Sequence, residues 1–423
     1  MLDIKILRNN PEIVKESLIK RNDKFDLDAF LALDNIWRNK LSELETLSAR
    51  QNILAQETQL LIKDKKDPKS KIEESKQLKS QLAELEKDFA QLDIDYKAKL
   101  DWLPNIVHSS VPVGDESKNE LVSQYGEKPD FKFKAKDHVT LAEELNMVDF
   151  KAGTKLTGTN FVTYTGDGAT LERALINFML DLHIKEHGYR EVSVPFLVNS
   201  KTMRATGQLP KLKDDMYNMS DDDFYLIPTA EVPVTNLKRD VLLDESELPI
   251  YNVCATPCFR REAGSYGKDT KGLMRLHQFD KVELVKFVKP GTSYDELEQL
   301  LENACKVLEL LKLPYRVVAL ASGDLSFAAA KCYDIEVYSP GIDKWLEVSS
   351  CSNFEDFQAR RGNIKYKDSK TGKREFVHTL NGSGLALPRL FTAILENYQQ
   401  EDGGVVIPEV LRGYFCGHER FSR

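Results

Sequence analysis

The sequence has no run of about 18 apolar residues, the length that a transmembrane helix needs. Its first residues, MLDIKILRNNPEIVKESL, carry polar and charged side chains from the third position onward and contain no apolar signal core. These two absences predict a cytoplasmic protein without a membrane partner.

Cysteine is sparse and forms no metal-binding pattern. The six cysteines are spread over the chain and show no CxxC spacing. Cys254 and Cys258 lie four residues apart on a predicted strand, where buried thiols are much more common than a zinc site. The sequence therefore predicts reduced core cysteines, no structural metal and no zinc.

An excess of positive charge is also missing, because the formal net charge is −8. An overall negative field opposes a polyanion, so composition alone argues against nucleic-acid binding. If RNA is bound, local basic patches must bind it.

The length of 423 residues leaves room for two or three domains with a large core.

Glycine is absent from residues 27–103, and Pro68 is the only proline there. In the second half of this segment, apolar residues recur at spacings of 4, 3, 4, 3 and 4: Leu78, Leu82, Leu85, Phe89, Leu92 and Tyr96. The first half has a weaker series: Trp37, Leu41, Leu44, Leu47, Leu54 and Leu61. This heptad pattern predicts an antiparallel coiled-coil arm whose outgoing helix, residues 27–65, is roughly 58 Å long.

The predicted tip of the arm collects five lysines and two aspartates. These lysines are Lys63, Lys65, Lys66, Lys69 and Lys71. A heptad hairpin is most often a dimerising coiled coil or a spacer. The alternative is a probe that reaches a distant phosphate backbone with its lysines. A linker rich in proline and glycine follows, and it places a domain boundary near residues 104–112.

Residues 258–287 read as two strands joined by a loop of glycines and charges. The loop contains Gly264, Gly267, Lys268, Asp269, Lys271 and Gly272, a composition that predicts an anion-handling loop. In the second predicted strand, residues 275–287, a period of two places Arg275, His277, Phe279, Lys281 and Glu283 on one face. A solvated outer face is the usual interpretation of such a strand. Here, however, Gln278 and Asp280 interrupt the opposite apolar face.

This hairpin resembles motif 2 of the class II aminoacyl-tRNA synthetases, and specifically of the seryl-tRNA synthetase family. The resemblance implies an α+β fold, in which helices flank an antiparallel β-sheet catalytic domain and an N-terminal helical hairpin arm binds tRNA. The implied domains are residues 1–104 and 105–423.

The same resemblance implies an ATP site on the hairpin. In it, Arg260 binds the α-phosphate and the amino acid carboxylate, Glu262 reads the adenine amino group and Arg275 binds the γ-phosphate. Phe279 stacks under adenine, and Leu276 belongs to the implied ATP-binding set. Arg261 belongs to the implied ATP segment, but its side chain is expected to alternate away from ATP.

Two further segments resemble parts of the same family. A helix over residues 170–187 followed by a strand over 190–198 with Pro195 resembles motif 1, which implies a homodimer. A monomer with an ordinary edge proline is about equally compatible with that segment alone. The triplet Thr229, Ala230 and Glu231 resembles the family's serine contact, although such residues in a turn more often form only a local hydrogen bond.

The strand over residues 345–353 carries Glu347, Val348, Ser349 and Ser350, which the resemblance places on ATP. Glu347 and Ser350 are the implied Mg²⁺-side residues. They lie on opposite faces of an ideal strand, so a bulge or turn is required there. A strand with one solvated acid is the commoner interpretation of this segment alone.

Residues 379–390 are expected to open the final helix and resemble motif 3. Gly382 and Gly384 are expected to allow close approach of the backbone, and Arg389 is expected to cover adenine opposite Phe279. Pro388 is tolerable only in the first turn of that helix. The implied serine pocket has Glu283 accepting from the substrate hydroxyl. Its other implied members are Thr229, Ala230, Glu231, Arg260, Asn381 and Ser383.

Together these segments imply an ATP-dependent ligase that joins L-serine to tRNA(Ser) with Mg²⁺, and they leave tRNA(Sec) open as a second substrate. Arg260, Arg275 and Arg389 are the implied catalytic residues, acting by positioning and charge neutralisation without a general base. The alternative is a catalytically inactive RNA-binding paralogue of the same fold. Loss of Arg260, Glu347 or Arg389 would favour that alternative, and all three are present.

Overall fold

The computed structural model describes residues 1–263 and 271–422, and the chain divides into two compact units. One unit comprises Asp3–Leu18 and Asp23–Leu103, and the other comprises Met1–Leu2, Ile19–Asn22 and Pro104–Arg423. The expected anion-handling loop falls largely outside the described residues. Of its members, Gly264, Gly267, Lys268 and Asp269 are not described, whereas Lys271 and Gly272 are.

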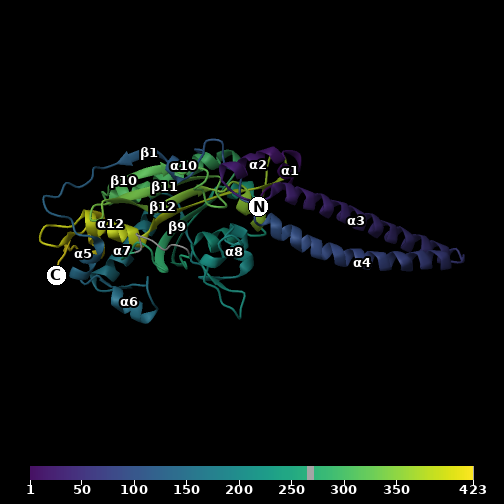
Figure 1. Ribbon diagram of the computed structural model, residues 1–423, viewed down its shortest axis with the longest axis horizontal. Coiled ribbons are helices and arrows are strands. Elements are labelled where there is room, and N and C mark those ends of the chain that lie inside the picture. Colours follow the sequence, from purple (N-terminus) through teal and green to yellow (C-terminus); the bar gives the residue numbers. More distant parts are fainter. Residues whose placement is uncertain (264–270, 423) are drawn as a thin grey trace. The chain divides into compact units, whose positions relative to one another are not determined.

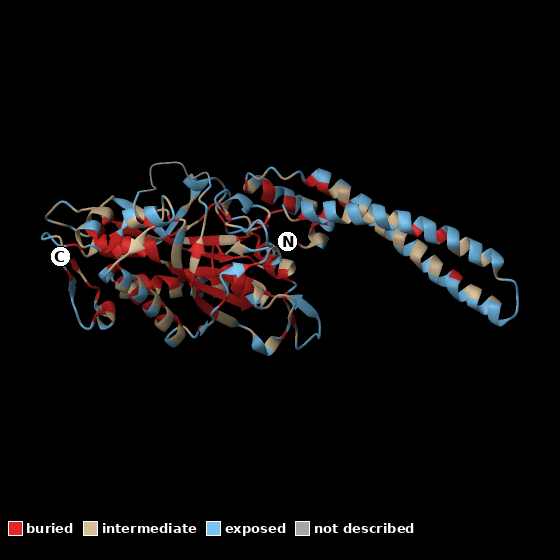
Figure 2. Ribbon diagram, turned by 90° about the horizontal axis from the view of Figure 1, so that it is seen from below, coloured by how far each residue is buried: buried red, intermediate tan, exposed pale blue. Residues whose placement is uncertain are grey.

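The first unit contains the predicted helical hairpin (Figure 1). Its two long helices are α3 (Leu27–Lys63) and α4 (Lys69–Leu100), preceded by α1 (Ile4–Asn9) and α2 (Pro11–Lys20). Every residue of the predicted apolar series is at least partly buried, and Leu54, Leu78 and Leu82 form a small core. Helix α3 ends two residues before the predicted Lys65, which adopts a positive φ of 56° in the turn. The remaining faces of both helices are exposed (Figure 2).

Buried polar contacts supplement the leucine seam of the arm. Asp34 is fully buried and accepts hydrogen bonds from Arg8 at 2.7 Å and from the Tyr96 hydroxyl at 3.0 Å. Farther along the arm, the Gln51 side chain donates to the Ser75 hydroxyl at 2.9 Å. Heptad spacing did not indicate these contacts, because Asp34, Gln51 and Ser75 lie outside the apolar series.

The second unit is built on an eight-stranded sheet in the order β1-β10-β11-β12-β15-β9-β8-β4. Its strands are β1 (Glu120–Tyr125), β10 (Tyr315–Ala319), β11 (Lys331–Ser339), β12 (Lys344–Asn353), β15 (His378–Ala386), β9 (Gln278–Val288), β8 (Ile250–Phe259) and β4 (Arg190–Glu191). All neighbouring strands are antiparallel except β4 and β8, which are parallel. The predicted antiparallel catalytic sheet is confirmed.

Helices cover both faces of this sheet (Figure 1). On one face α7 (Asp167–Lys185), α10 (Ser293–Leu310) and α12 (Leu387–Asn397) pack against the strands. On the other, α9 (Glu231–Asn236) packs on β9 and α11 (Phe357–Gly362) packs on β15, with α8 (Ser200–Thr206) beside them. The sheet core is therefore buried from both sides (Figure 2).

The remaining elements are short. The helices are α5 (His138–Glu144) and α6 (Phe150–Leu156), with 3-10 turns at Glu116–Lys118, Lys213–Asp215, Glu245–Glu247, Pro290–Thr292 and Glu409–Phe415. The strands are β2 (Val148–Asp149), β3 (Thr163–Tyr164), β5 (Leu197–Val198), β6 (Tyr225–Leu226), β7 (Leu242–Asp244), β13 (Lys365–Lys367), β14 (Arg374–Phe376), β16 (Val405–Val406) and β17 (Arg420–Phe421).

Two boundaries differ from the prediction. Strand β9 begins at Gln278 rather than at Arg275, because the N–H of His277 donates to the carbonyl of Asn160 at 3.0 Å instead of continuing the ladder with β8. The prediction of a single strand over residues 190–198 is wrong. This segment contains two short strands, β4 and β5, and Pro195 lies between them, where its missing N–H interrupts no ladder.

The two glycines of the expected motif 3 lie in strand β15 and not in a loop that opens the final helix. Both face the helical layer. A Cβ at Gly382 would lie 2.7 Å from the Cys351 sulfur, and one at Gly384 would lie 2.9 Å from Nε2 of His183 on α7. The close approach that they permit is therefore between sheet and helix. Pro388 lies in the first turn of α12, as required.

Within the described part of the chain, no helix combines the length and apolar character needed to cross a membrane. The same residues contain no cluster of three histidine, cysteine or acidic side chains arranged to hold a metal ion. Cys254 and Cys258 are buried free thiols, which confirms the expectation of core cysteines.

Candidate active site

A cavity of about 620 Å³ lies over the sheet face opposite α7 and α10. It gathers most of the residues that the sequence indicated. From the implied ATP set it is lined by Arg260, Glu262, Arg275, Leu276, Phe279, Glu347, Val348, Ser349, Ser350 and Arg389. From the implied serine set it is lined by Thr229, Glu231, Arg260, Glu283, Asn381 and Ser383.

Three residues lie elsewhere. Arg261 is exposed, and its guanidinium lies 5.9 Å from the ring of Tyr217 rather than in the cavity. Ala230 is fully buried in a neighbouring apolar cluster and does not line the cavity. His277 precedes the strand, so it does not share the face of Phe279, and its Nδ1 contacts the carbonyl of Arg260 at 3.0 Å.

Strand register brings the serine-side residues together. Ser383 of β15 lies directly opposite Glu283 of β9, and a period of two puts Lys281 and Phe279 on the same face as Glu283. Glu283 is 2% exposed, so its carboxylate faces the cavity wall and not bulk water. The Thr229 hydroxyl donates to it at 3.0 Å.

Lys281 is a site residue to which sequence reasoning gave no role. It is 8% exposed, forms a close ion pair with Glu283, and donates to the Thr229 hydroxyl at 3.0 Å. Its position two residues from both Phe279 and Glu283 was the available signal. A buried lysine neutralises one carboxylate at this end of the cavity.

Glu231, the first residue of α9, is the second buried carboxylate. It accepts a hydrogen bond of 2.6 Å from the Gln358 amide. Burial and the nearby Glu283 raise the pKa of Glu231 to about 7. With Glu231 ionised, two carboxylates and one ammonium meet here, which leaves one negative charge for a small cationic ligand.

Arginines line the other end of the cavity. The Arg260 guanidinium lies 5.3 Å from the centre of the Phe279 ring. Arg275 pairs with Glu262 at 2.8 Å, and Arg389 donates to the backbone carbonyl of Glu347 at 2.6 Å. Glu262 reaches the cavity because it has left the strand, with a positive φ of 51°.

The bulge required near Glu347 is present in β12. Ser350 pairs with Asp334 of β11, whereas Glu347 pairs with Glu336, so Val348 is the extra residue between them. Asp334 and Glu336 are two residues apart and share a face. Glu347 and Ser350 therefore share that face as well. Burial and, secondarily, the neighbouring Glu347 raise the pKa of Asp334 to about 8.

Two further wall segments were not assigned a role from the sequence. One is the turn of Thr206, Gly207 and Gln208, where Gly207 ends α8 with a φ of +95°. The other is the turn formed by residues 326–328. The available signal was the glycine directly after a short helix, which is typical of a left-handed C-cap.

The tip of the arm keeps most of the predicted basic surface. Lys63, Lys65, Lys66 and Lys69 are exposed. Lys71 belongs instead to an ion-pair network within the arm, at 2.9 Å from Glu57 and 3.5 Å from Glu74. Its assignment to the tip surface is therefore weakened, because its charge is already balanced.

Two family models match the chain. The seryl-tRNA synthetase N-terminal domain matches residues 1–107, and the tRNA synthetase class II core domain (G, H, P, S and T) matches residues 213–398. The chain is 54% identical over 415 residues to a serine–tRNA ligase of Carboxydothermus hydrogenoformans, which covers 98% of both proteins. It is 51% identical over 423 residues to one of Geobacter sulfurreducens, which covers 100% of both.

Among solved structures, the chain resembles the crystal structure of seryl-tRNA synthetase from Pyrococcus horikoshii complexed with ATP. The TM-score is 0.91 at 39% sequence identity, and the match covers 100% of this chain and 99% of the other. A cytoplasmic serine–tRNA ligase from Naegleria fowleri in complex with AMP gives a TM-score of 0.86 at 30% identity.

Proposed function

The chain belongs to the seryl-tRNA synthetase family, and from this premise we propose how its residues divide the reaction. The enzyme activates L-serine with ATP as seryl-adenylate and transfers the seryl group to tRNA(Ser). Nothing supports the inactive paralogue, since Arg260, Glu347 and Arg389 all line the cavity.

We assign ATP to the arginine end of the cavity. Two anions, the serine carboxylate and the α-phosphate, must approach each other, so a fixed cation is needed between them. Arg260 lies between the serine end and the Phe279 ring and fits that role. Arg275 faces the outer phosphates, and Phe279 and Arg389 hold the two sides of adenine. In this account catalysis consists of positioning and charge neutralisation.

The residues near the β12 bulge fit a hard divalent cation. Glu347 offers a carboxylate and Ser350 a hydroxyl on the same face of β12, and oxygen ligands of this kind suit Mg²⁺. We propose that Glu347 and Ser350 hold Mg²⁺ together with ATP. The ion supplies neutralisation of the phosphate charge that develops during adenylate formation.

Serine selectivity is assigned to the buried polar end. Glu283 accepts from the substrate hydroxyl, and the ammonium group of serine meets Glu231. Alanine lacks the hydroxyl that would donate to Glu283, and a buried carboxylate deprived of that donor rejects such an analogue strongly. Asn381 and Ser383 complete the wall, and threonine is excluded by size.

The remaining assignments concern partners and organisation. We propose that the exposed lysines at the arm tip contact the tRNA phosphate backbone, reading shape and not base sequence.

We also propose that the protein is a cytoplasmic homodimer whose subunits meet at the β4 edge of the sheet. We further propose that the chain divides into two domains, residues 1–104 and 105–423. The family match over residues 1–107 and the contact-based division near Leu103 support that boundary.

The single observation that carries the proposal is the buried Glu283, with Thr229 and Lys281, in the same cavity as three arginines. Serine-dependent ATP–pyrophosphate exchange, measured beside alanine and threonine, tests it. We expect exchange with serine and a discrimination of about 10,000-fold or more against alanine. Absence of serine-dependent exchange would remove the proposal.

The pKa of Glu231 predicts a pH dependence of serine binding. Because burial raises its pKa to about 7, ionisation costs the free enzyme stability as the pH rises through that value, yet it creates the anion that attracts the ammonium. We expect KM for serine to fall between about pH 6 and about pH 8 as Glu231 ionises. Glu231→Gln should flatten this profile, and a variant that keeps the wild-type slope contradicts the assignment.

Arg389→Ala should weaken ATP use, because one wall of the adenine slot is removed. We expect KM for ATP in the exchange assay to rise about tenfold, with KM for serine changed less than about twofold. Arg389→Lys is the matched control, since it keeps the charge but not the planar stacking surface. It should remain impaired, and unchanged activity in the alanine variant would refute the role.

A further inference from the structure

We propose that His138 is a positioning residue for the ATP site, because it links helix α12, which carries Arg389, to the backbone just before Arg275. Neither residue touches His138. His138 would hold two walls of the cavity in place relative to each other, and this role rests on the proposed function of that cavity.

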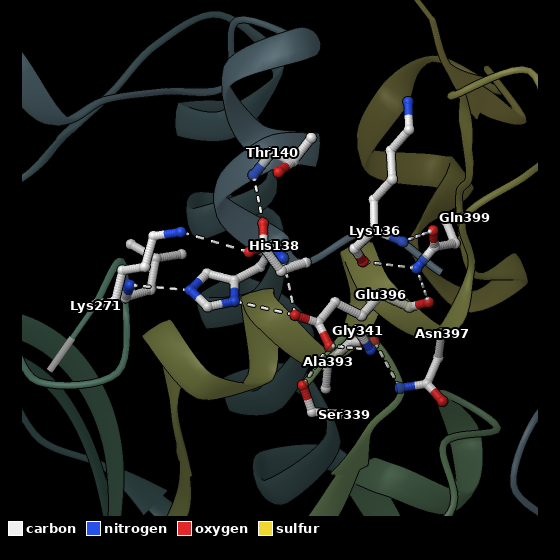
Figure 3. A network of polar contacts seen from close by, with 12 residues as sticks. Lys136, His138, Thr140, Lys271, Ser339, Gly341, Ala393, Glu396, Asn397 and Gln399 are labelled. Atoms are coloured by element: carbon white, nitrogen blue, oxygen red, sulfur yellow. Dashed lines mark hydrogen bonds and ion pairs between the residues drawn. The ribbon is translucent and has the colours of Figure 1, made fainter. Parts of the chain in front are cut away.

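The first half of the link is a buried carboxylate on α12. Glu396 is fully buried, and one of its oxygens accepts from the His138 backbone N–H at 2.8 Å and lies 3.0 Å from His138 Nδ1. Its other oxygen accepts from the Gly341 N–H at 2.9 Å and from the Ser339 hydroxyl. Figure 3 shows these groups converging on Glu396 from two segments, the start of α5 with His138 and the end of β11 with Ser339 and, just after it, Gly341. Glu396 lies seven residues after Arg389, two helical turns along the same side of α12.

The second half is the opposite nitrogen of the same ring. Nε2 of His138 lies 3.2 Å from the backbone N–H of Leu273, which lines the cavity two residues before Arg275. A backbone N–H can only donate, so Nε2 must accept and the proton must reside on Nδ1, facing Glu396. One neutral imidazole thus joins both partners at once, and it is only 3% exposed.

Neighbouring contacts support the same docking. Gly272 has a φ of +70°, and a Cβ added there would lie 2.4 Å from His138 Nε2 and 2.4 Å from a Val139 methyl group. Lys271 lies 3.6 Å from Asp137, the N-cap of α5. The segment Lys271 to Leu273 is therefore seated on the start of α5, where His138 also hydrogen-bonds to Glu396 of α12.

Two substitutions separate the two contacts. His138→Asn can place an amide donor where Nδ1 was and keep Glu396 satisfied, but it removes the acceptor for Leu273. His138→Gln can place an acceptor where Nε2 was and keep the Leu273 contact, while the backbone N–H of residue 138 still donates to Glu396 on α12. If the link to the hairpin is what matters, KM for ATP in serine-dependent exchange should rise about fivefold in the asparagine variant and stay within about twofold in the glutamine variant. KM for serine should be unchanged in both.

Equal behaviour of the two variants, whether both normal or both impaired, would overturn the proposal. Gly272→Ala tests the same contact from the hairpin side without altering the histidine. The added Cβ would clash with the His138 ring, so this variant should also raise KM for ATP. Thermal unfolding of each variant shows whether it folds. Wild-type exchange separates the two claims: no exchange in the wild type removes the proposed function, whereas wild-type exchange without a split between Asn and Gln removes only the role of His138.

Discussion

Replacing Arg260 by alanine is expected to reduce kcat for serine-dependent ATP–pyrophosphate exchange by about 100-fold to 1,000-fold, the effect typical of removing one preorganised donor from a reacting centre. The guanidinium lies 5.3 Å from the Phe279 ring, and its Nε donates to the Pro228 carbonyl at 3.3 Å. It is thereby held between the serine and adenine ends. A loss confined to KM for ATP would contradict a role at the junction of the two substrates.

Arg261 offers a matched control one residue away. It carries the same charge on the same segment, but it is exposed and outside the cavity. Arg261→Ala should leave the exchange rate within about twofold of wild type, as surface substitutions away from a site usually do. If both variants lost activity equally, the local positive charge and not the placement of Arg260 would be responsible.

Shortening the arm is expected to separate the two half-reactions. Replacing residues 46–80 by a short glycine-serine turn removes the basic tip but keeps the base of the hairpin, including the contacts of Asp34 with Arg8 and Tyr96. Trp37 also keeps its 3.1 Å hydrogen bond to Asp93. Exchange should remain near the wild-type rate, while kcat/KM for tRNA aminoacylation should fall on the order of 100-fold or more.

A charge variant tests the same division without a deletion. Changing Lys63, Lys65, Lys66 and Lys69 to glutamine should weaken tRNA binding and reduce its dependence on salt concentration. The control removes the same charge from exposed lysines of the other unit, Lys118, Lys155, Lys367 and Lys370. Loss of exchange in the shortened protein would show that the arm supports the fold of the catalytic unit, and the proposed division would then be wrong.

Features encoded by a short sequence period could be predicted. The arm follows from apolar residues every three or four positions, and each member of that series is at least partly buried. The cavity face of β9 follows from a period of two, which aligns Phe279, Lys281 and Glu283. The bulge at Val348 was required because Glu347 and Ser350 could not otherwise share a face.

Features that depend on residues far apart in the sequence could not be predicted. Ser293 and Glu296 have the spacing of a capping box, but Glu296 pairs instead with Lys286 at 2.8 Å and the Ser293 hydroxyl lies 2.8 Å from His378. Gly382 and Gly384 were expected to allow close approach of the backbone at the start of the final helix, but they lie in β15, where Cys351 and His183 fill the space that they leave. No local pattern distinguishes these uses from the expected ones.

The central claim is that one face of the β8–β9 ribbon, together with the start of α12, forms a slot in which ATP and serine meet. A crystal structure with a non-hydrolysable seryl-adenylate analogue tests it most directly. The adenine should lie between the Phe279 ring and the Arg389 guanidinium, with the serine hydroxyl within hydrogen-bond distance of Glu283. An analogue bound away from Phe279, or a serine side chain that does not contact Glu283, would contradict the account.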